Sequence, residues 1–354
     1  MRKQTLGKLL AAGLLATSAP TALHAQAGDY GEQFDNVLGS EVAQQFDDVL
    51  GTSPRANERF DAVYDSDLEQ QITRLADGSR GRIGVYAIDL SSGQEVSVMA
   101  DQRFPMASTS KVAIAAVYLA GVDAGKWTLT SEWRLPRRNG AYMPAQRHID
   151  LMISKSCNSC TDAMLNAVGG PAVVNKWMRE TAGIEGFELT RDIATLIRED
   201  GRIDPASSVD RRDSATPRAM GQLLAGIYQG KWISEASRNV ILNAMRATTT
   251  GKDRMRAALP MSASLANKTG TLSRTASDIG IFHTPDGRAI AAAIYVTGQS
   301  SSMASENGNR GLKLEARRMR DARISTITQA LYRGFAGPDA DDPRIWADAE
   351  YGGE

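Results

Sequence analysis

The segment RFPMASTSK at positions 103–111 places Ser108 three residues before Lys111, where an extended run gives way to an apolar one. Residues three apart share a helix face, so the lysine amine is expected beside the serine hydroxyl. The following run, KVAIAAVYLAG, is apolar nearly all round, which predicts a buried helix. Lysine is almost never fully buried unless it is paired or functional, and burial lowers the pKa of its ammonium group. The pair therefore predicts an activated nucleophile, because a neutral amine can take the serine proton.

The pair alone is a weak signal, since a serine three residues before a lysine occurs by chance roughly once in a chain of this length. The bland interpretation is an exposed lysine on a surface helix, which the apolar surroundings oppose. A Ser-His-Asp triad is the competing arrangement. His148 and His283 are its only candidates beyond the first residues, and the chain has no G-x-S-x-G motif. Lysine is the better partner for the serine.

Two further segments complete an ordered set of motifs. SKSCNSCTDAMLNAVGG carries Ser156 and Asn158 at a predicted helix start, and LANKTGTLS carries Lys268, Thr269 and Gly270 at the end of a predicted strand. Each segment alone is ordinary. In the order S-x-x-K, S-x-N, K-T-G they resemble the serine β-lactamases and penicillin-binding proteins, and with FPMASTSK in front they resemble the class A β-lactamase family. The resemblance covers roughly Asp67 to Phe335.

The resemblance implies the roles of the groups that make and break bonds. Ser108 is the expected nucleophile, and Lys111 is its expected base or proton relay. Ser156 is expected to pass a proton to the lactam nitrogen that leaves. The backbone N–H groups of Ser108 and Thr271 are expected to form the oxyanion hole, whose donors are each worth a few kcal/mol.

The resemblance also implies which residues bind the substrate. Asn158 is expected to hydrogen-bond the amide of the substrate side chain and the lysine amine. Lys268 and Thr269 are expected to hold the substrate carboxylate, while Gly270 lets the strand approach closely. In TTTGKDRMRAALP, Arg254 matches an arginine that points into the site in part of the family; a solvated arginine at a helix end is the alternative.

The acid that activates water for deacylation is the weakest part of the match. The family has Glu-x-x-Leu-Asn in its Ω-loop, and LTRDIATLIREDGRIDPASSVDRRD lacks this motif. Asp213 resembles the anchor that ends the loop, and counting back from it reaches Asp200, with Glu199 adjacent. Asp192 and Asp204 remain open. A shorter side chain would sit about an ångström too far, which can cost ~100-fold in rate.

Cys157 and Cys160 are the only two cysteines. Cys157 stands where the family usually has a structural aspartate. A metal site would need further Cys or His ligands, so two interpretations remain: a local disulfide, or two buried thiols beside the site. The helical spacing allows the disulfide but makes its geometry demanding, and we favour the thiols.

The chain divides into four predicted parts. Residues 1–27 have a basic start, a short apolar run and small residues at a cleavage point, which indicates a signal peptide. Residues 28–66 hold the repeats QFDNVLG, QFDDVLG and RFDAVYD and form an acidic linker. Residues 67–336 form the catalytic domain, and 337–354 form a tail. We expect a periplasmic or secreted protein without stable membrane insertion.

The predicted fold is α+β and two-lobed. GRIGVYAIDLSSGQEVSVMADQ predicts a hairpin, and three more strands come from the segments between 263 and 298. A final helix is predicted from Leu312 to Phe335. The middle of the chain is mostly helical, with starts at Thr216-Pro217 and Ser234. These elements predict an antiparallel sheet built from both chain ends, flanked by helices, with an inserted all-helical lobe and a ligand cleft between the lobes.

The resulting hypothesis is a monomeric serine β-lactamase that hydrolyses the amide bond of β-lactams through a Ser108 acyl-enzyme, without metal, cofactor or nucleotide. The alternative is a related serine hydrolase or D,D-peptidase that penicillin acylates and that releases it slowly. A third hypothesis makes the chain a partner-binding module that works through its repeats. The 41 basic and 41 acidic residues balance, so no net field favours nucleic acid or an anionic membrane.

Overall fold

The computed structural model of the chain describes residues 52–54, 66–77 and 79–337. The predicted signal peptide (1–27) lies outside these residues, as do the repeats of the predicted linker and nearly all of the predicted tail. Within the predicted linker, residues 52–54 form strand β1 (Thr52–Pro54), which pairs antiparallel with β8 (Ser208–Asp210).

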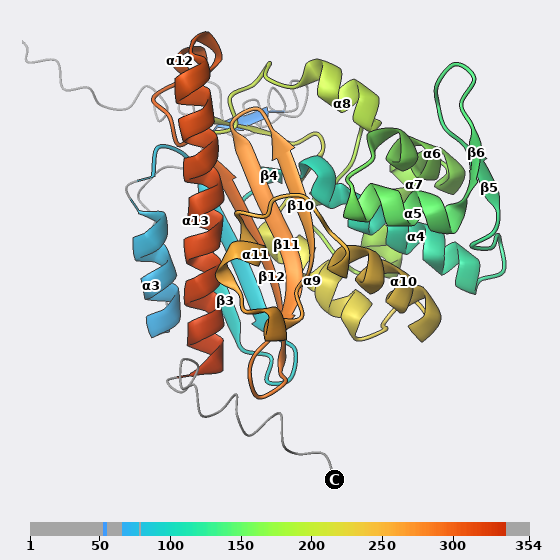
Figure 1. The fold of residues 1–354 in the computed structure, drawn as a ribbon, viewed down its shortest axis with the longest axis horizontal. Helices are drawn as coiled ribbons and strands as arrows, with labels where there is room; N and C mark the ends of the chain where they lie inside the picture. Colours follow the sequence, from blue (N-terminus) through green and yellow to red (C-terminus); the bar gives the residue numbers. More distant parts are fainter. Residues whose placement is uncertain (1–51, 55–65, 78, 338–354) are drawn as a thin grey trace, which may run out of the picture. The chain divides into compact units, whose positions relative to one another are not determined.

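A five-stranded antiparallel sheet forms one lobe, with the strand order β10-β11-β12-β2-β3 (Figure 1). Its strands are β2 (Ile83–Asp89), β3 (Glu95–Val98), β10 (Ala266–Leu272), β11 (Thr275–His283) and β12 (Ala289–Thr297). Strand β2, from the start of the globular part, pairs with β12, from its end, with Val85 opposite Ile294. The predicted hairpin and the sheet built from both chain ends are confirmed.

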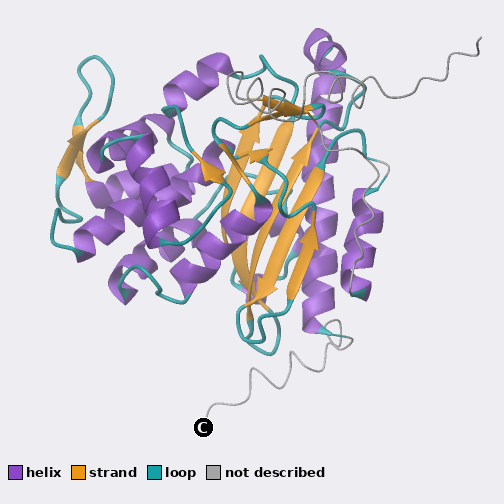
Figure 2. Cartoon of the chain, turned by 180° about the vertical axis from the view of Figure 1, so that it is seen from behind, coloured by secondary structure: helices purple, strands orange, loops and turns teal. Residues whose placement is uncertain are grey.

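The sheet is buried on both faces, and side chains along β12 alternate between two cores as the strand period requires. Ala292, Ile294 and Val296 pack with side chains of α3 (Asp67–Ala76) and α13 (Arg310–Ala336). Ala291, Ala293 and Tyr295 belong to the core shared with the helical lobe. Figure 2 shows the sheet from behind, with the helical lobe beside it.

The inserted lobe is helical, as predicted. It contains α4 (Lys111–Asp123), α5 (Ala145–Ser154), α6 (Asn158–Val168), α7 (Pro171–Lys176), the π-helical turn η2 (Trp177–Thr181), α8 (Ile193–Glu199), α9 (Pro217–Tyr228) and α10 (Glu235–Arg246). Helix α4 is its centre, because all residues from Lys111 to Leu119 are buried. The predicted caps are present: Thr216 accepts a hydrogen bond at the start of α9, and Ser234 does so at the start of α10.

Short strands connect the lobes near the predicted nucleophile. They are β4 (Phe104–Pro105), β7 (Phe187–Glu188) and β9 (Ser214–Ala215), which form one small sheet. The separate hairpin of β5 (Glu132–Arg134) and β6 (Tyr142–Pro144) lies apart from them, at the outer edge of the helical lobe (Figure 1). Phe104 lies opposite Ala215, and the Met106 N–H donates to Asp213 O at 3.0 Å. The end of the predicted Ω-loop is thereby attached to the segment that leads into Ser108.

The last long helix, α13, has 27 residues, so it begins two residues before and ends one residue after the predicted range. At 1.5 Å per residue it is about 40 Å long, and Figure 1 shows it running along the sheet next to α3. Three short elements complete the description: α11 (Met255–Ala258), η3 (Met261–Ala263) and α12 (Met303–Gly308). None of the helices in the described ranges is long and apolar enough to cross a membrane.

Candidate active site

Ser108 lies in the 3₁₀ turn η1 (Ala107–Ser110), which leads directly into α4. The two hydroxyls that follow it are satisfied internally: Thr109 donates to Met106 O at 2.7 Å and Ser110 to Ala107 O at 2.9 Å. Ser108 instead lines an open cavity of about 640 Å³. It is therefore the one hydroxyl of this turn that is presented to a ligand.

Lys111 is completely buried at the start of α4. Its Nζ lies 2.9 Å from Ser156 O, 2.8 Å from Asn158 Oδ1 and 3.2 Å from Ser156 Oγ. Burial lowers the pKa of the amine well below its usual value, and the charge of Lys268 lowers it further. A neutral amine has two N–H groups, which suit the two carbonyl oxygens, and a lone pair that suits a hydroxyl proton.

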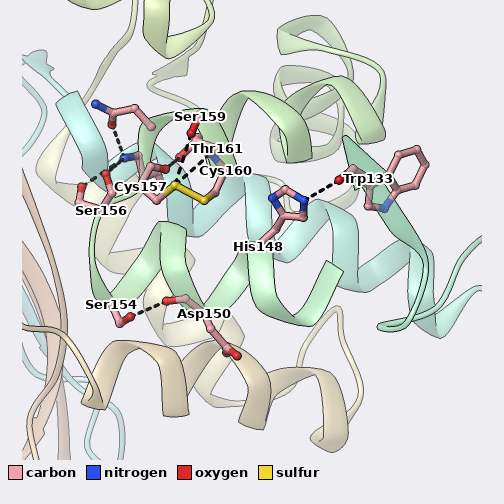
Figure 3. Close-up of a disulfide and its surroundings, with 11 residues drawn as sticks. Trp133, His148, Asp150, Ser154, Ser156, Cys157, Ser159, Cys160 and Thr161 are labelled. Carbon is pink, nitrogen blue, oxygen red and sulfur yellow. Dashed lines mark hydrogen bonds between the residues drawn. A yellow bond between two sulfur atoms is a disulfide. The ribbon is translucent and has the colours of Figure 1, made fainter. Parts of the chain in front are cut away.

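Ser156 and Asn158 flank the turn between α5 and α6, and both line the cavity with Ser108. Ser156 has a φ of 57°, so the chain bends sharply there. The three predicted residues Lys111, Ser156 and Asn158 are thus brought together by hydrogen bonds. Figure 3 shows this turn, with Ser156 next to the sulfur atoms of Cys157 and Cys160.

The favoured interpretation of Cys157 and Cys160 as free thiols is wrong, because the structure joins them in a disulfide. The geometry assumed for two helical residues does not apply. Cys157 is the N-cap of α6, with φ and ψ of −58° and 115°, and only Cys160 is inside the helix. Their Cα atoms are 5.3 Å apart, within the usual range for a disulfide. The bridge spans Asn158 and directly follows Ser156.

Lys268 reaches the same serine from β10. Its Nζ lies 3.2 Å from Ser156 Oγ and 2.8 Å from Thr269 O. Burial lowers the pKa of Lys268 to about 7, against the attraction of the Asp278 carboxylate. Two amines that share one hydroxyl repel each other when both are charged, which favours one charged and one neutral lysine.

Strand β10 forms one wall of the cavity through Thr269 and Thr271. Gly270, between them, packs closely against the chain in front of Ser108. A Cβ atom there would lie 2.8 Å from Met106 O and 2.4 Å from Ser277 Oγ. The predicted close approach of this strand therefore rests on the absence of a side chain at Gly270.

Arg254 is buried and lines the cavity, so the alternative of a solvated arginine is wrong. Its Nε forms an ion pair with Asp321 at 2.6 Å, and its Nη2 lies 2.8 Å from Thr271 Oγ1. Its Nη1 donates to Gly270 O at 2.8 Å and to Ser277 O at 2.9 Å. The guanidinium is fixed beside β10 by contacts with all three nitrogens.

The structure does not bring Glu199 and Asp200 to the cavity of Ser108. Both line a different, small hollow, in which Glu199 pairs with Arg191 at 2.5 Å and Asp200 accepts from the Ser273 N–H at 3.0 Å. Counting back from Asp213 assumed a fixed loop length, whereas α8 and the turn after it carry these acids to the end of β10.

The other two candidate acids also have structural partners. Asp192 caps α8 by accepting from the Thr195 N–H at 2.6 Å, and Asp204 pairs with Arg274 at 2.8 Å. Neither lines the cavity. The four acids considered for water activation are thus engaged elsewhere.

The loop itself is anchored as the sequence suggested. Asp213 is almost fully buried and accepts from the Thr190 N–H at 2.8 Å, the Arg191 N–H at 3.0 Å and Arg191 Nε at 2.5 Å. A second anchor was not predicted. Asp162 of α6 accepts from the Ile193 N–H at 2.7 Å and the Ala194 N–H at 3.2 Å. Burial raises the pKa of Asp162, whose charge also acts on Lys111.

The histidine alternative is not supported by the positions of the two imidazoles. His148 Nε2 lies 2.8 Å from Trp133 O, and His283 Nε2 lies 3.2 Å from the Tyr228 hydroxyl. Neither ring lines the cavity of Ser108. Across the described part of the chain, no group of three or more His, Cys, Asp or Glu side chains is placed to hold a metal ion.

Sequence reasoning missed the contribution of α13 to the cavity. Leu314, Arg317, Arg318 and Asp321 all line it. No local motif marks these residues, although their spacing by three, four and seven positions indicates one helix face. The position of α13 across the cavity could be found only from the fold.

The chain is similar in sequence to known β-lactamases. Residues 67–335 match the sequence model of a family described as the beta-lactamase enzyme family. Beta-lactamase CTX-M-97 of Escherichia coli is 31% identical over 218 residues, which are 58% of this chain and 72% of that protein. Beta-lactamase CTX-M-8 of Citrobacter amalonaticus is 30% identical over 237 residues, 63% of this chain and 78% of that protein.

Solved structures of β-lactamases are also similar to this chain. An ancestral class A beta-lactamase has a TM-score of 0.65 and 29% identity, and the match covers 75% of this chain and 98% of that one. A beta-lactamase from Chitinophaga pinensis has a TM-score of 0.64 and 26% identity, with 75% and 98% covered. The predicted two-lobed α+β fold is confirmed.

Proposed function

The chain belongs to the class A serine β-lactamase family, and we propose that it hydrolyses the amide bond of β-lactams through an acyl-enzyme formed on Ser108. The observation that carries this proposal is that Ser108, Ser156 and Asn158 line one cavity, and that the buried Lys111 amine is hydrogen-bonded to Ser156 and Asn158. Neither a metal nor a nucleotide takes part in the proposed steps.

Acylation begins with the neutral Lys111 amine. It takes the Ser108 proton, directly or through Ser156, and the serine oxygen attacks the lactam carbonyl. The backbone N–H groups of Ser108 and Thr271 stabilise the oxyanion. Ser156 then gives a proton to the lactam nitrogen as the ring opens, and its contact with both lysines supplies the route for reprotonation.

The substrate is held by its carboxylate and its side-chain amide. Thr269 and Thr271 present hydroxyls on the β10 wall, and Lys268 and Arg254 supply positive charge behind them. Asn158 binds the amide, and its Oδ1 also fixes Lys111. Binding energy from these groups positions the carbonyl at Ser108.

The rate of deacylation distinguishes hydrolysis of β-lactams from the slow-releasing alternative. The comparisons favour hydrolysis, while the positions of Glu199 and Asp200 give neither acid a place at the acyl group. We propose that release proceeds without them, so Glu199→Gln and Asp200→Asn variants should retain deacylation rates close to that of the original protein.

The test is nitrocefin turnover by the purified protein, combined with intact-mass spectrometry. We expect turnover, and a transient adduct that maps to Ser108. The Ser108→Ala variant should lose both, whereas Ser110→Ala, which removes a neighbouring hydroxyl bonded to Ala107 O, should keep both. A stable adduct without turnover would support the slow-releasing alternative. Expression in a susceptible bacterium should raise resistance to a penicillin, and Ser108→Ala should abolish that resistance.

We propose that residues 1–27 direct export and are removed, and that the mature protein works as a monomer in the periplasm or outside the cell. The support is the sequence pattern of these residues. Intact mass of the protein from the periplasmic fraction should show an N-terminus near Gly28, and light scattering should give the monomer mass. An unprocessed N-terminus would contradict the export proposal.

A further inference from the structure

One face of α13 forms a wall of the cavity that contains Ser108. Leu314, Arg317, Arg318 and Asp321 line it, at positions i, i+3, i+4 and i+7 of the helix. Asp321 pairs with Arg254, and it thereby fixes this helix face beside the groups proposed to bind the substrate carboxylate. The other three residues have no role in the proposed reaction.

The charge of this wall is not balanced within the cavity. The charged residues that line it are Lys252, Asp253, Arg254, Arg317, Arg318 and Asp321. Because Arg254 and Asp321 neutralise each other, three cations face one remaining anion. Both Arg317 and Arg318 are exposed, and within the described residues neither has an ion pair. Arg320, on another face of α13, is by contrast paired with Glu306 at 2.7 Å.

The cavity also continues along α13 beyond the carboxylate site. A second hollow of about 490 Å³ shares Asp253, Arg318 and Asp321 with the first. Leu314, whose exposed fraction is 47%, adds an apolar surface to the same wall. A ligand bound at Arg254 by its ring carboxylate can therefore extend a substituent along this helix, to the guanidinium groups of Arg317 and Arg318 and to the apolar surface of Leu314 about one turn further on.

We propose that Arg317 and Arg318, with Lys252, form a second anion-binding subsite that selects β-lactams carrying an additional acid. The preferred substrates have an aromatic substituent that ends in a carboxylate or sulfonate, attached to the ring carbon next to the one that bears the carboxylate. The aromatic part contacts Leu314, and the acid pairs with the arginines. This inference rests on the proposed function and adds a substrate class to it.

The experiment compares two cephalosporins that differ only in this substituent, a carboxyaryl group and its neutral carboxamide. The original protein should show a higher kcat/KM for the acid, mainly through a lower KM. In the Arg317→Gln/Arg318→Gln variant, kcat/KM for the acid should fall about tenfold, which is within the range for two exposed ion pairs, and that for the carboxamide should stay nearly unchanged. High salt should reduce the preference.

A matched control removes the same charge elsewhere on the helix. Arg310 and Lys313 are exposed residues of α13 that do not line the cavity, so Arg310→Gln/Lys313→Gln should leave both substrates unaffected. Equal kcat/KM values for acid and carboxamide in the original protein, or equal losses in the arginine variant, would overturn the subsite. Calorimetric binding of both compounds to the Ser108→Ala protein decides the preference even without turnover, so failure of the proposed function and failure of the subsite are distinguished.

Discussion

Replacing Gly270 by alanine tests whether β10 positions the nucleophile. The new Cβ atom would lie 2.8 Å from Met106 O, two residues before Ser108, and 2.4 Å from Ser277 Oγ. The serine hydroxyl can rotate away, but the carbonyl belongs to the backbone. It has to move by about 0.6 Å to reach an ordinary contact of 3.4 Å.

The size of that displacement sets the expected losses of stability and of kcat/KM. Overpacking of a close contact costs about 1–3 kcal/mol of stability, and the lower chain entropy of alanine in the unfolded state offsets about 0.4–1 kcal/mol of it. Because a misplacement of about 1 Å costs ~100-fold in rate, a shift of this size at the turn before Ser108 should lower kcat/KM by roughly tenfold.

Urea unfolding and nitrocefin kinetics measure the two effects separately. Gly308→Ala is the matched control, since a Cβ there meets nothing within 4 Å, and it should change neither quantity by much. A Gly270→Ala protein of lower stability but unchanged kcat/KM would refute the reasoning, because β10 would then support the fold without positioning Ser108.

Three further predictions follow from the charges and the disulfide. Burial gives Lys268 a pKa of about 7, so it loses its charge as the pH rises through that value, and KM for an anionic β-lactam should rise above pH ~7 in a pH series. Reducing Cys157–Cys160 with dithiothreitol should lower kcat/KM by about tenfold, because the bridge holds Ser156 and Asn158, while circular dichroism should show an intact fold. Asp213→Asn should lower the free energy of unfolding by about 3 kcal/mol in urea, since it breaks a buried ion pair with Arg191.

The disulfide and Asp213 predictions each have a control variant. The activity of a Cys157→Ser/Cys160→Ser variant should not respond to dithiothreitol; a response would place the effect of the reductant elsewhere. Glu180→Gln removes an exposed pair with Lys176, for which about 1 kcal/mol or less is expected. An equal loss in the Asp213→Asn and Glu180→Gln variants would contradict the anchoring role of Asp213. A KM that does not change across pH ~7 would contradict the role of Lys268.

Much of the fold was predictable because periodicity and caps are local. The apolar run after Lys111 became the buried helix α4, and Thr216 and Ser234 cap the helices that they were expected to cap. The meeting of Lys111, Ser156 and Asn158 was predicted from the order of the motifs, which supplies the long-range information that each motif lacks alone.

The other features of the fold and the site depend on three-dimensional geometry, which the spacing of residues along the sequence does not encode. The disulfide forms because Cys157 leaves the helical conformation at the N-cap of α6. The path of the chain between Arg191 and Asp213 depends on α8 and a following turn, so counting residues misplaced Glu199 and Asp200. The α13 wall of the cavity arises from packing across the sheet, which no local pattern of charges around Arg317 reveals.

The central claim is that Lys111 acts as a neutral base, and Lys111→Arg tests it most directly. Arginine keeps the positive charge but does not deprotonate in proteins, so it can replace a lysine that acts only through charge. Rapid-quench intact-mass spectrometry measures the rate of adduct formation on Ser108 across a pH series from mildly acidic to mildly alkaline, and the melting temperature verifies the fold. We predict acylation about 10²–10⁴ times slower than in the original protein at every pH; an arginine variant that acylates at the original rate would contradict the account.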